Sequence, residues 1–80
     1  MASETKLKQV LADVFGVDVS RINDAASVDT IEKWDSLNHL KLVLALEEQF
    51  GVSLSEERIV EMLNYPLVKA VLEEHGIEFR

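Results

Sequence analysis

The stretch SLNHLKLVLALEEQF, residues Ser36–Phe50, decides the fold of this chain. On a helical wheel at about 100° per residue, its apolar side chains form two separate arcs. The arc expected to face a core holds Leu42, Val43, Leu46 and Phe50. The second arc, here called the leucine stripe, holds Leu37, Leu40 and Leu44, with Glu47 and Glu48 at its far end. A helix in a small bundle does not readily bury both arcs. We therefore expect the leucine stripe to be exposed and to bind a partner, unless the preceding loop covers it.

A helix and a long loop are predicted before this stretch. The helix, Glu4–Phe15, repeats apolar residues at the i, i+3, i+4, i+7 spacing. It lies between Ser3, a suitable N-cap residue, and Gly16, a suitable stop. Residues 17–35 follow and are rich in Asp, Asn and Ser, which favour turns.

Two more helices are predicted after it. The third helix is short, residues 56–63, and the fourth begins at Pro66 and stops at Gly76. Residues 77–80 are expected to form a frayed tail. The predicted fold is all-α: a small four-helix bundle with a long loop between helices 1 and 2 and a short third helix. The length suits a single domain of residues 1–80.

The composition limits the classes of function. The chain has 15 acidic and 8 basic residues, a formal net charge of -7. Such a surface repels nucleic acid and anionic membranes and attracts a protein with a basic docking patch. There is no cysteine, so thioester chemistry would need a thiol from a cofactor. The N-terminus has no long apolar run, which predicts a cytoplasmic location without a signal peptide or stable membrane insertion.

Asp35 and Ser36 begin the central helix, and this position matters chemically. The first turn of a helix offers N–H groups without intrahelical acceptors and a partial positive charge. It therefore tolerates a phosphodiester better than a helix interior does. Asp35 would repel that phosphate, so we expect it to cap the helix and to hold a cation or a basic side chain of a modifying enzyme. Spacing alone favours a simpler interpretation, in which the two residues are only a capping pair.

The residues around Ser36 resemble those of a known family. Asp35-Ser36-Leu37 is similar to the Asp-Ser-Leu attachment motif of acyl carrier proteins. Residues 42–52, LVLALEEQFGV, resemble that family's second helix and its exit, and residues 24–27 resemble the loop that leads to the motif. The resemblance covers nearly the whole chain. The tripeptide alone is a weak signal, but before this helix it is a specific one.

The resemblance implies that a phosphopantetheinyl transferase attaches 4'-phosphopantetheine from coenzyme A to Ser36, flanked by Asp35 and Leu37. The chain would be a monomeric carrier, not an enzyme. It would hold acyl groups as thioesters for acyl-loading and acyl-processing enzymes of fatty-acid, polyketide or related specialised biosynthesis. The partner surface would consist of Leu37, Leu40, Lys41, Leu44, Glu47 and Glu48. The acyl pocket would consist of His39, Val43, Leu46, Ile59, Met62 and Leu63.

Three residues depart from the usual pattern of fatty-acid carriers, and a fourth, His39, needs an interpretation of its own. Asn38 and Lys41 stand where fatty-acid carriers usually have acids, which weakens the negative field beside Ser36 and changes partner choice mainly through on-rate. Trp34 stands where the family usually has a small residue, and a tryptophan at this place looks more like carriers of specialised pathways, including polyketide and aminoacyl carriers. Alternatively, it anchors the loop on the bundle. His39 falls in the core arc, either as a half-buried histidine with a hydrogen-bond partner or as a residue that makes the acyl cavity more polar.

Other classes of function fit the sequence less well. A serine hydrolase would need a Gly-x-Ser-x-Gly elbow, which is absent, and 80 residues leave little room for a triad and a pocket. His39 and His75 are far apart and no calcium-loop pattern occurs, so no metal site is predicted. The serious alternative is a non-carrier acidic helical adaptor. It would bind one partner through the leucine stripe and would not need Ser36.

Overall fold

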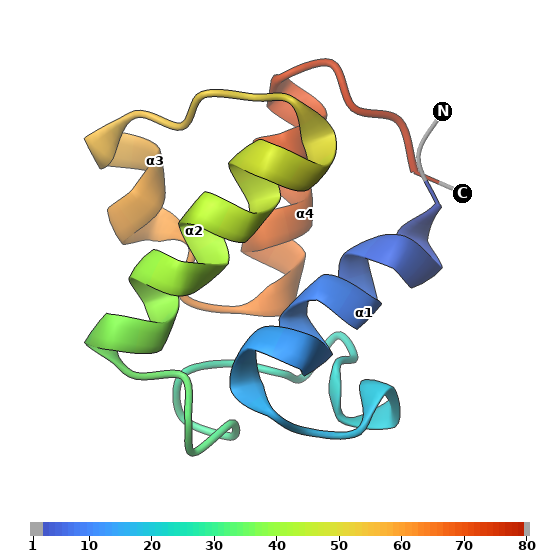
Figure 1. Ribbon diagram of the computed structural model, residues 1–80, viewed down its shortest axis with the longest axis vertical. Helices are drawn as coiled ribbons and strands as arrows, with labels where there is room; N and C mark the ends of the chain where they lie inside the picture. Colours follow the sequence, from blue (N-terminus) through green and yellow to red (C-terminus); the bar gives the residue numbers. More distant parts are fainter. Residues whose placement is uncertain (1–2, 80) are drawn as a thin grey trace.

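A computed structural model describes residues 3–79, which form four α-helices and one short 3₁₀ helix, with no β-strand among them. In chain order the elements are α1 (Glu4–Phe15), the 3₁₀ helix η1 (Val19–Arg21), α2 (Ser36–Phe50), α3 (Glu56–Glu61) and α4 (Tyr65–Glu74). Figure 1 shows α2 between α1 and α3, with α4 behind it. The prediction of an all-α fold with four helices is confirmed. Within the described range, every helix is too short or too polar to cross a bilayer.

Capping residues set both ends of α1 and α2. The side chains of Ser3 and Asp35 each accept a backbone N–H from the first turn of the helix that follows. Gly16 and Gly51 each have a φ of 65° at the other ends, in the left-handed region that other residues enter only at a cost. Because both pairs of signals are visible in the sequence, the predicted bounds of these two helices agree with the structure.

The core is one cluster of apolar side chains to which all three long helices contribute. The fully buried side chains that these helices contribute are Leu7, Leu11 and Phe15 of α1, Leu42 and Leu46 of α2, and Tyr65, Val68 and Leu72 of α4. Burial of a side chain of this size contributes about 1.5–3 kcal/mol relative to leaving it exposed. This cluster therefore provides most of the stability and fixes the face that α2 turns inward.

A polar contact at the edge of this core joins α4 to α1. The hydroxyl of Tyr65 donates to Glu4 Oε2 at 2.7 Å, and Lys69 Nζ lies 3.3 Å from Glu4 Oε1. These two contacts, the Tyr65 hydrogen bond above all, hold the pKa of Glu4 below its usual value. Burial, reinforced by the Glu4 carboxylate, raises the pKa of Tyr65 above its ordinary range.

The segment between α1 and α2 is bound to the connection between α3 and α4. Ser27 pairs with Asn64 in an isolated antiparallel bridge, and the N–H of Val28 donates to the carbonyl of Leu63 at 3.1 Å. These contacts place Val28 beside α3, although about thirty residues separate the two in sequence.

Trp34 fixes the end of this segment just before α2. Its side chain is only 3% exposed and stacks on Phe15 of α1, with ring centroids 4.7 Å apart. Stacked aromatic pairs of this kind add to the stabilisation that burial alone provides. The interpretation of Trp34 as a loop anchor is confirmed.

The predicted junction between α3 and α4 differs from the observed one. α3 ends at Glu61, before the predicted 63, because Met62 leaves helical geometry with φ -81° and ψ 61° and its side chain is fully buried. α4 begins at Tyr65, because the side chain of Asn64 caps it by accepting a backbone N–H of its first turn. Pro66 therefore occupies the second helical position, where its missing N–H also costs little.

The C-terminal end also differs from the prediction. α4 ends at Glu74, two residues before the expected stop. Phe79 packs edge-on against Phe50, with ring centroids 5.8 Å apart, and lies against the core. The expectation of a frayed tail is therefore wrong for residues 77–79, and Arg80 lies outside the described residues.

Candidate functional site

Ser36 is exposed and is the first residue of α2. The residues on both sides of it are held in place: Asp35 Oδ1 accepts the N–H of Asn38 at 2.9 Å, and the side-chain amide of Asn38 donates to the carbonyl of Lys33 at 2.8 Å. Because Asp35 caps the N–H of Asn38, the N–H groups of Ser36 and Leu37 lie at the open end of the helix. This end combines a reachable hydroxyl with the positive end of the helix dipole.

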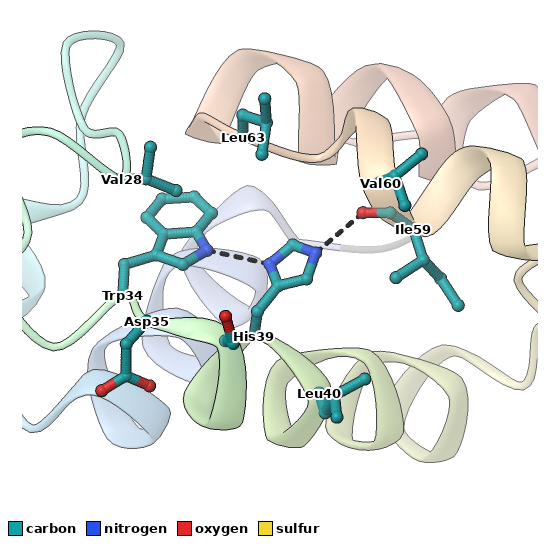
Figure 2. A pocket seen from close by; sticks show the side chains of 9 residues that line it. Val28, Trp34, Asp35, His39, Leu40, Ile59, Val60 and Leu63 are labelled. Carbon is teal, nitrogen blue, oxygen red and sulfur yellow. Dashed lines mark hydrogen bonds between the residues drawn. The ribbon is translucent and has the colours of Figure 1, made fainter.

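A cavity of about 620 Å³ opens beside Ser36, between the segment before α2, α2 itself and α3. Figure 2 shows the residues that surround it. Beyond Asp35 and Ser36, the cavity is lined by Val28, Trp34, His39, Leu40, Ile59, Val60 and Leu63. Most of these side chains are apolar, so the cavity suits a hydrocarbon group attached near Ser36.

A hydrogen-bonded bridge crosses this site through His39. Trp34 Nε1 lies 3.0 Å from His39 Nδ1, and His39 Nε2 lies 2.7 Å from the carbonyl oxygen of Ile59, as Figure 2 shows. An indole N–H can only donate, so Nδ1 accepts and the ring proton is on Nε2, which donates to Ile59. His39 is thus a half-buried histidine with both nitrogens bonded. Neither nitrogen is available to bond a cargo molecule.

The structure brings together only some of the residues predicted for the acyl pocket. His39, Ile59 and Leu63 line the cavity. Val43, Leu46 and Met62 do not line it; they are 5%, 0% and 0% exposed and belong to the closed core.

Besides Asp35 and Ser36, which were predicted for the cofactor, four lining residues were not predicted for this pocket: Val28, Trp34, Leu40 and Val60. Val28 and Trp34 reach the cavity through the fold of the preceding segment, which a helical wheel does not describe. Val60 sits beside the predicted Ile59 and could have been found by its place in α3. Leu40, predicted for the partner surface, lies where that surface meets the cavity.

The leucine stripe is exposed. Leu37, Leu40 and Leu44 keep 63%, 57% and 66% of their accessible surface. The segment before α2 therefore does not cover them, and the alternative considered for this stripe is wrong. Lys41 is also exposed and lies among these leucines along the helix.

The two acids at the far end of the stripe differ in their surroundings. Glu47 Oε2 accepts the N–H of Leu54 at 2.9 Å and so fixes the connection from α2 to α3. Glu48 is exposed to solvent. Of the two, Glu48 is the more available for a contact with a basic partner.

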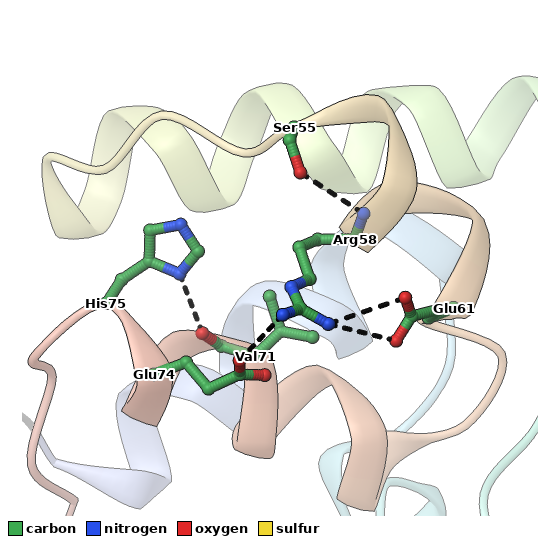
Figure 3. A network of polar contacts seen from close by, with 6 residues as sticks. All are labelled: Ser55, Arg58, Glu61, Val71, Glu74 and His75. Carbon is green, nitrogen blue, oxygen red and sulfur yellow. Dashed lines mark hydrogen bonds and ion pairs between the residues drawn. The ribbon is translucent and has the colours of Figure 1, made fainter.

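Contacts with α4 hold α3, which forms one wall of the cavity. Arg58 Nη2 pairs with Glu74 at 3.0 Å, and Arg58 Nη1 lies 3.3 Å from Glu61 within α3 (Figure 3). The Ser55 side chain caps the helix by accepting the N–H of Arg58. These contacts position the carbonyl of the neighbouring Ile59 toward His39.

Comparisons with known proteins match this chain over most of its length. The family described as a phosphopantetheine attachment site matches residues 5–74. A protein named acyl carrier protein, from Solidesulfovibrio magneticus (strain ATCC 700980 / DSM 13731 / RS-1), is 41% identical over 58 residues, which cover 71% of this chain and 73% of that relative. The match and the fold define the class of protein: a carrier of a prosthetic group, not an enzyme. The chain belongs to the phosphopantetheine attachment family, and its resemblance to acyl carrier proteins is confirmed.

The start of α2 fits the prosthetic group of that family, phosphopantetheine. A phosphodiester at Ser36 would lie at the end of α2 where backbone N–H groups and the helix dipole favour an anion. The apolar cavity begins at the same residue and can receive what the flexible arm carries.

Proposed function

We propose that this chain is an acyl carrier in which Ser36 Oγ holds 4'-phosphopantetheine and the arm's thiol carries acyl groups as thioesters. The observation that carries this proposal is the exposed Ser36 at the first position of α2, beside an apolar cavity of about 620 Å³. The matched family and the named relative support it. The proposed carrier domain spans residues 1–80 and acts as a cytoplasmic monomer.

The loading step uses coenzyme A as donor and a separate transferase as catalyst. Ser36 Oγ forms a bond to the phosphorus next to pantetheine, the pyrophosphate bond of coenzyme A breaks, and adenosine 3',5'-bisphosphate leaves. The hydroxyl proton passes to a base of the transferase or to solvent. The residues of this chain present the hydroxyl: Asp35 caps α2, and Asn38 ties the helix start to Lys33, so Ser36 is held outward.

The partner surface in this proposal is the leucine stripe together with Lys41, Glu47 and Glu48. Exposed leucines rimmed by charge suit an interface whose partner offers apolar and basic groups. Glu48 supplies the free charge, while Glu47 also holds the turn to α3.

We assign the carrier to a specialised pathway, such as polyketide or aminoacyl biosynthesis, ahead of general fatty-acid synthesis. Asn38 and Lys41 reduce the negative field that basic partners of fatty-acid carriers would meet. Trp34 and His39 make the site beside Ser36 more crowded and more aromatic than a small residue would.

The test is intact mass after incubation with coenzyme A and a broad-specificity phosphopantetheinyl transferase. We expect one phosphopantetheine adduct on the parent protein and none on Ser36→Ala. A matched control is Ser55→Ala, which changes another serine at a helix start and should still load. A folded parent protein that gains no adduct, while the transferase loads a known carrier, would favour the adaptor that binds through the leucine stripe.

A further inference from the structure

The three residues of the bridge, Trp34, His39 and Ile59, all line the cavity beside Ser36, and two of them, Trp34 and Ile59, also belong to the core or pack against it. We propose that this bridge limits how deeply an acyl chain enters the bundle, and that His39 is the residue that determines chain-length specificity. The inference rests on the proposed function of Ser36 and goes beyond it, because it concerns which cargo the carrier shelters.

The geometry of the two helices supports a barrier at His39. On α2, Val43 and Leu46 follow His39 by four and seven residues, so the three side chains lie along one face. Just past the end of α3, Met62 follows Ile59 by three residues and is fully buried. The cavity touches His39 and Ile59, the first residue of each row, and none of the deeper residues. A chain that moves from the cavity toward the deeper rows must therefore pass the His39–Ile59 hydrogen bond.

Both ends of the bridge are held in place, so it does not yield freely. Trp34 is stacked on Phe15 in the core. Ile59 follows Arg58, whose pairing with Glu74 fixes α3 to α4 (Figure 3). In Figure 2 the indole, the imidazole and the Ile59 carbonyl form one continuous line across the site.

The free energies of hydrogen bonding and of methylene burial favour an acyl chain that stays in the cavity and does not enter the core. The relevant equilibrium constant is that for moving the acyl chain from the cavity into the core. Leaving a half-buried donor or acceptor unpaired lowers it by roughly tenfold, so breaking both hydrogen bonds of His39 would lower it by roughly a hundredfold. Each methylene that moves from water into an apolar site raises the constant by about fourfold. About three to four further methylenes would have to be buried to offset the broken bridge. Short chains should therefore stop at the bridge.

The experiment measures shelter of the thioester as a function of chain length. The full chain is loaded from acyl-coenzyme A donors from acetyl to palmitoyl, and loading on Ser36 is first checked by intact mass. The rate of thioester cleavage by neutral hydroxylamine and the thermal midpoint are then measured. For the parent protein we expect protection to rise with the first methylenes and then to level off over about the next three to four, until longer chains offset the broken bridge.

Two variants open the bridge in different ways. His39→Ala removes the central ring, whereas Trp34→Phe removes the indole donor, and with it one of the two hydrogen bonds of His39, but keeps a smaller aromatic ring to stack on Phe15. In His39→Ala, protection should continue to rise past the length at which the parent protein levels off, by up to about fourfold per methylene. In Trp34→Phe, which keeps the His39–Ile59 hydrogen bond, the plateau should be shorter than in the parent protein by about one to two methylenes. His75→Ala is the matched control. His75 also bonds a backbone carbonyl, that of Val71 at 2.8 Å, but it does not line the cavity, so this variant should behave as the parent protein does.

The outcomes separate the two proposals. Failure of the parent protein to load would contradict the proposed function of Ser36. If the protein loads and its protection rises with every added methylene, without a plateau, the bridge is no barrier. If the folded variants show the same plateau as the parent protein, His39 does not set the limit. Protection that does not depend on chain length in any variant would also overturn the inference. Should His39→Ala fail to fold, the parent series and Trp34→Phe still decide.

Discussion

Replacement of Tyr65 by Phe should weaken the fold in a way that depends on pH. The Tyr65 side chain is fully buried, and its hydroxyl donates to the Glu4 carboxylate at 2.7 Å. A hydrogen bond to a charged group contributes about 1.5–3 kcal/mol. Lys69 remains paired with Glu4, and the Glu4 side chain is 29% exposed, so the carboxylate keeps a partner and some contact with water. We therefore expect the free energy of unfolding to fall by about 2 kcal/mol at neutral pH. For a domain of this size, that loss lowers Tm by roughly 8–16 °C.

The pH dependence follows from the two pKa shifts. The pKa of Glu4 is lowered in the folded protein, chiefly by the Tyr65 hydrogen bond. Its stabilisation is therefore present above the unfolded pKa of about 4.3 and is lost as pH falls through the folded value. The pKa of Tyr65 is raised by burial and by Glu4. Its contribution is present below the unfolded pKa of about 10 and decreases as pH rises beyond it. The difference between parent and variant should therefore be largest between these limits.

Urea unfolding followed by circular dichroism, at pH values from about 3 to 11, measures this difference. Glu4→Gln is the matched control, because it keeps an acceptor for the Tyr65 hydroxyl but removes the charge. Its free energy of unfolding should therefore fall less than that of Tyr65→Phe. Tyr65 is the only tyrosine of the chain, so the absorbance of tyrosinate reports its ionisation without interference. A difference in the free energy of unfolding that stays near zero, or that does not change with pH, would refute this reasoning.

Four other substitutions test the roles of single side chains outside the core. Leu44→Arg should change the free energy of unfolding by less than about 0.5 kcal/mol, because Leu44 is 66% exposed; it should slow acyl transfer to a partner enzyme, and unchanged transfer would remove Leu44 from the interface. Glu47→Ala should cost about 1–2 kcal/mol because it leaves the Leu54 N–H unpaired, whereas Glu48→Ala should cost under about 0.5 kcal/mol; equal costs in chemical denaturation would contradict this. Asp35→Ala should cost about 1 kcal/mol through loss of the α2 cap, and a thermal scan without a shift would argue against that role.

The sequence predicts those parts of the fold that local signals determine. The bounds of α1 and α2 follow from a capping side chain at one end and a left-handed glycine at the other. The end of α3 and the start of α4 could not be predicted in this way, because burial of one side chain and capping by another set them, and the apolar spacing does not. Burial of Met62 draws the chain out of α3 early, and Asn64 caps α4, so that the helix begins at Tyr65, one residue before Pro66.

The candidate site was only partly predictable, for a similar reason. The wheel separated the exposed leucine stripe from the core face, and it placed His39 on the inner face of α2. It could not show that Val43 and Leu46 are closed off from the cavity, because that depends on His39 bonding Trp34 and Ile59 across three separate segments. Contacts between segments distant in sequence carry no periodic signal.

The bridge also changes how His39 contributes to the site. A free imidazole in the cavity would favour polar cargo, as the sequence suggested. With both nitrogens bonded, His39 instead presents a ring face and edge to the cavity, and its polar atoms are already satisfied. Such a wall would contact the apolar part of a cargo molecule, up to a limited length, and would offer no hydrogen bond to its polar part.

The most direct measurement of the central claim is the mass of the peptide that contains Ser36 after the protein is loaded from acetyl-coenzyme A with a phosphopantetheinyl transferase. The account predicts an acetylated phosphopantetheine on Ser36, located by fragmentation, from which neutral hydroxylamine removes only the acetyl group and leaves the arm in place. An adduct on another serine, an acetyl group that resists hydroxylamine, or no adduct on a folded protein would contradict the claim that Ser36 carries acyl groups as thioesters.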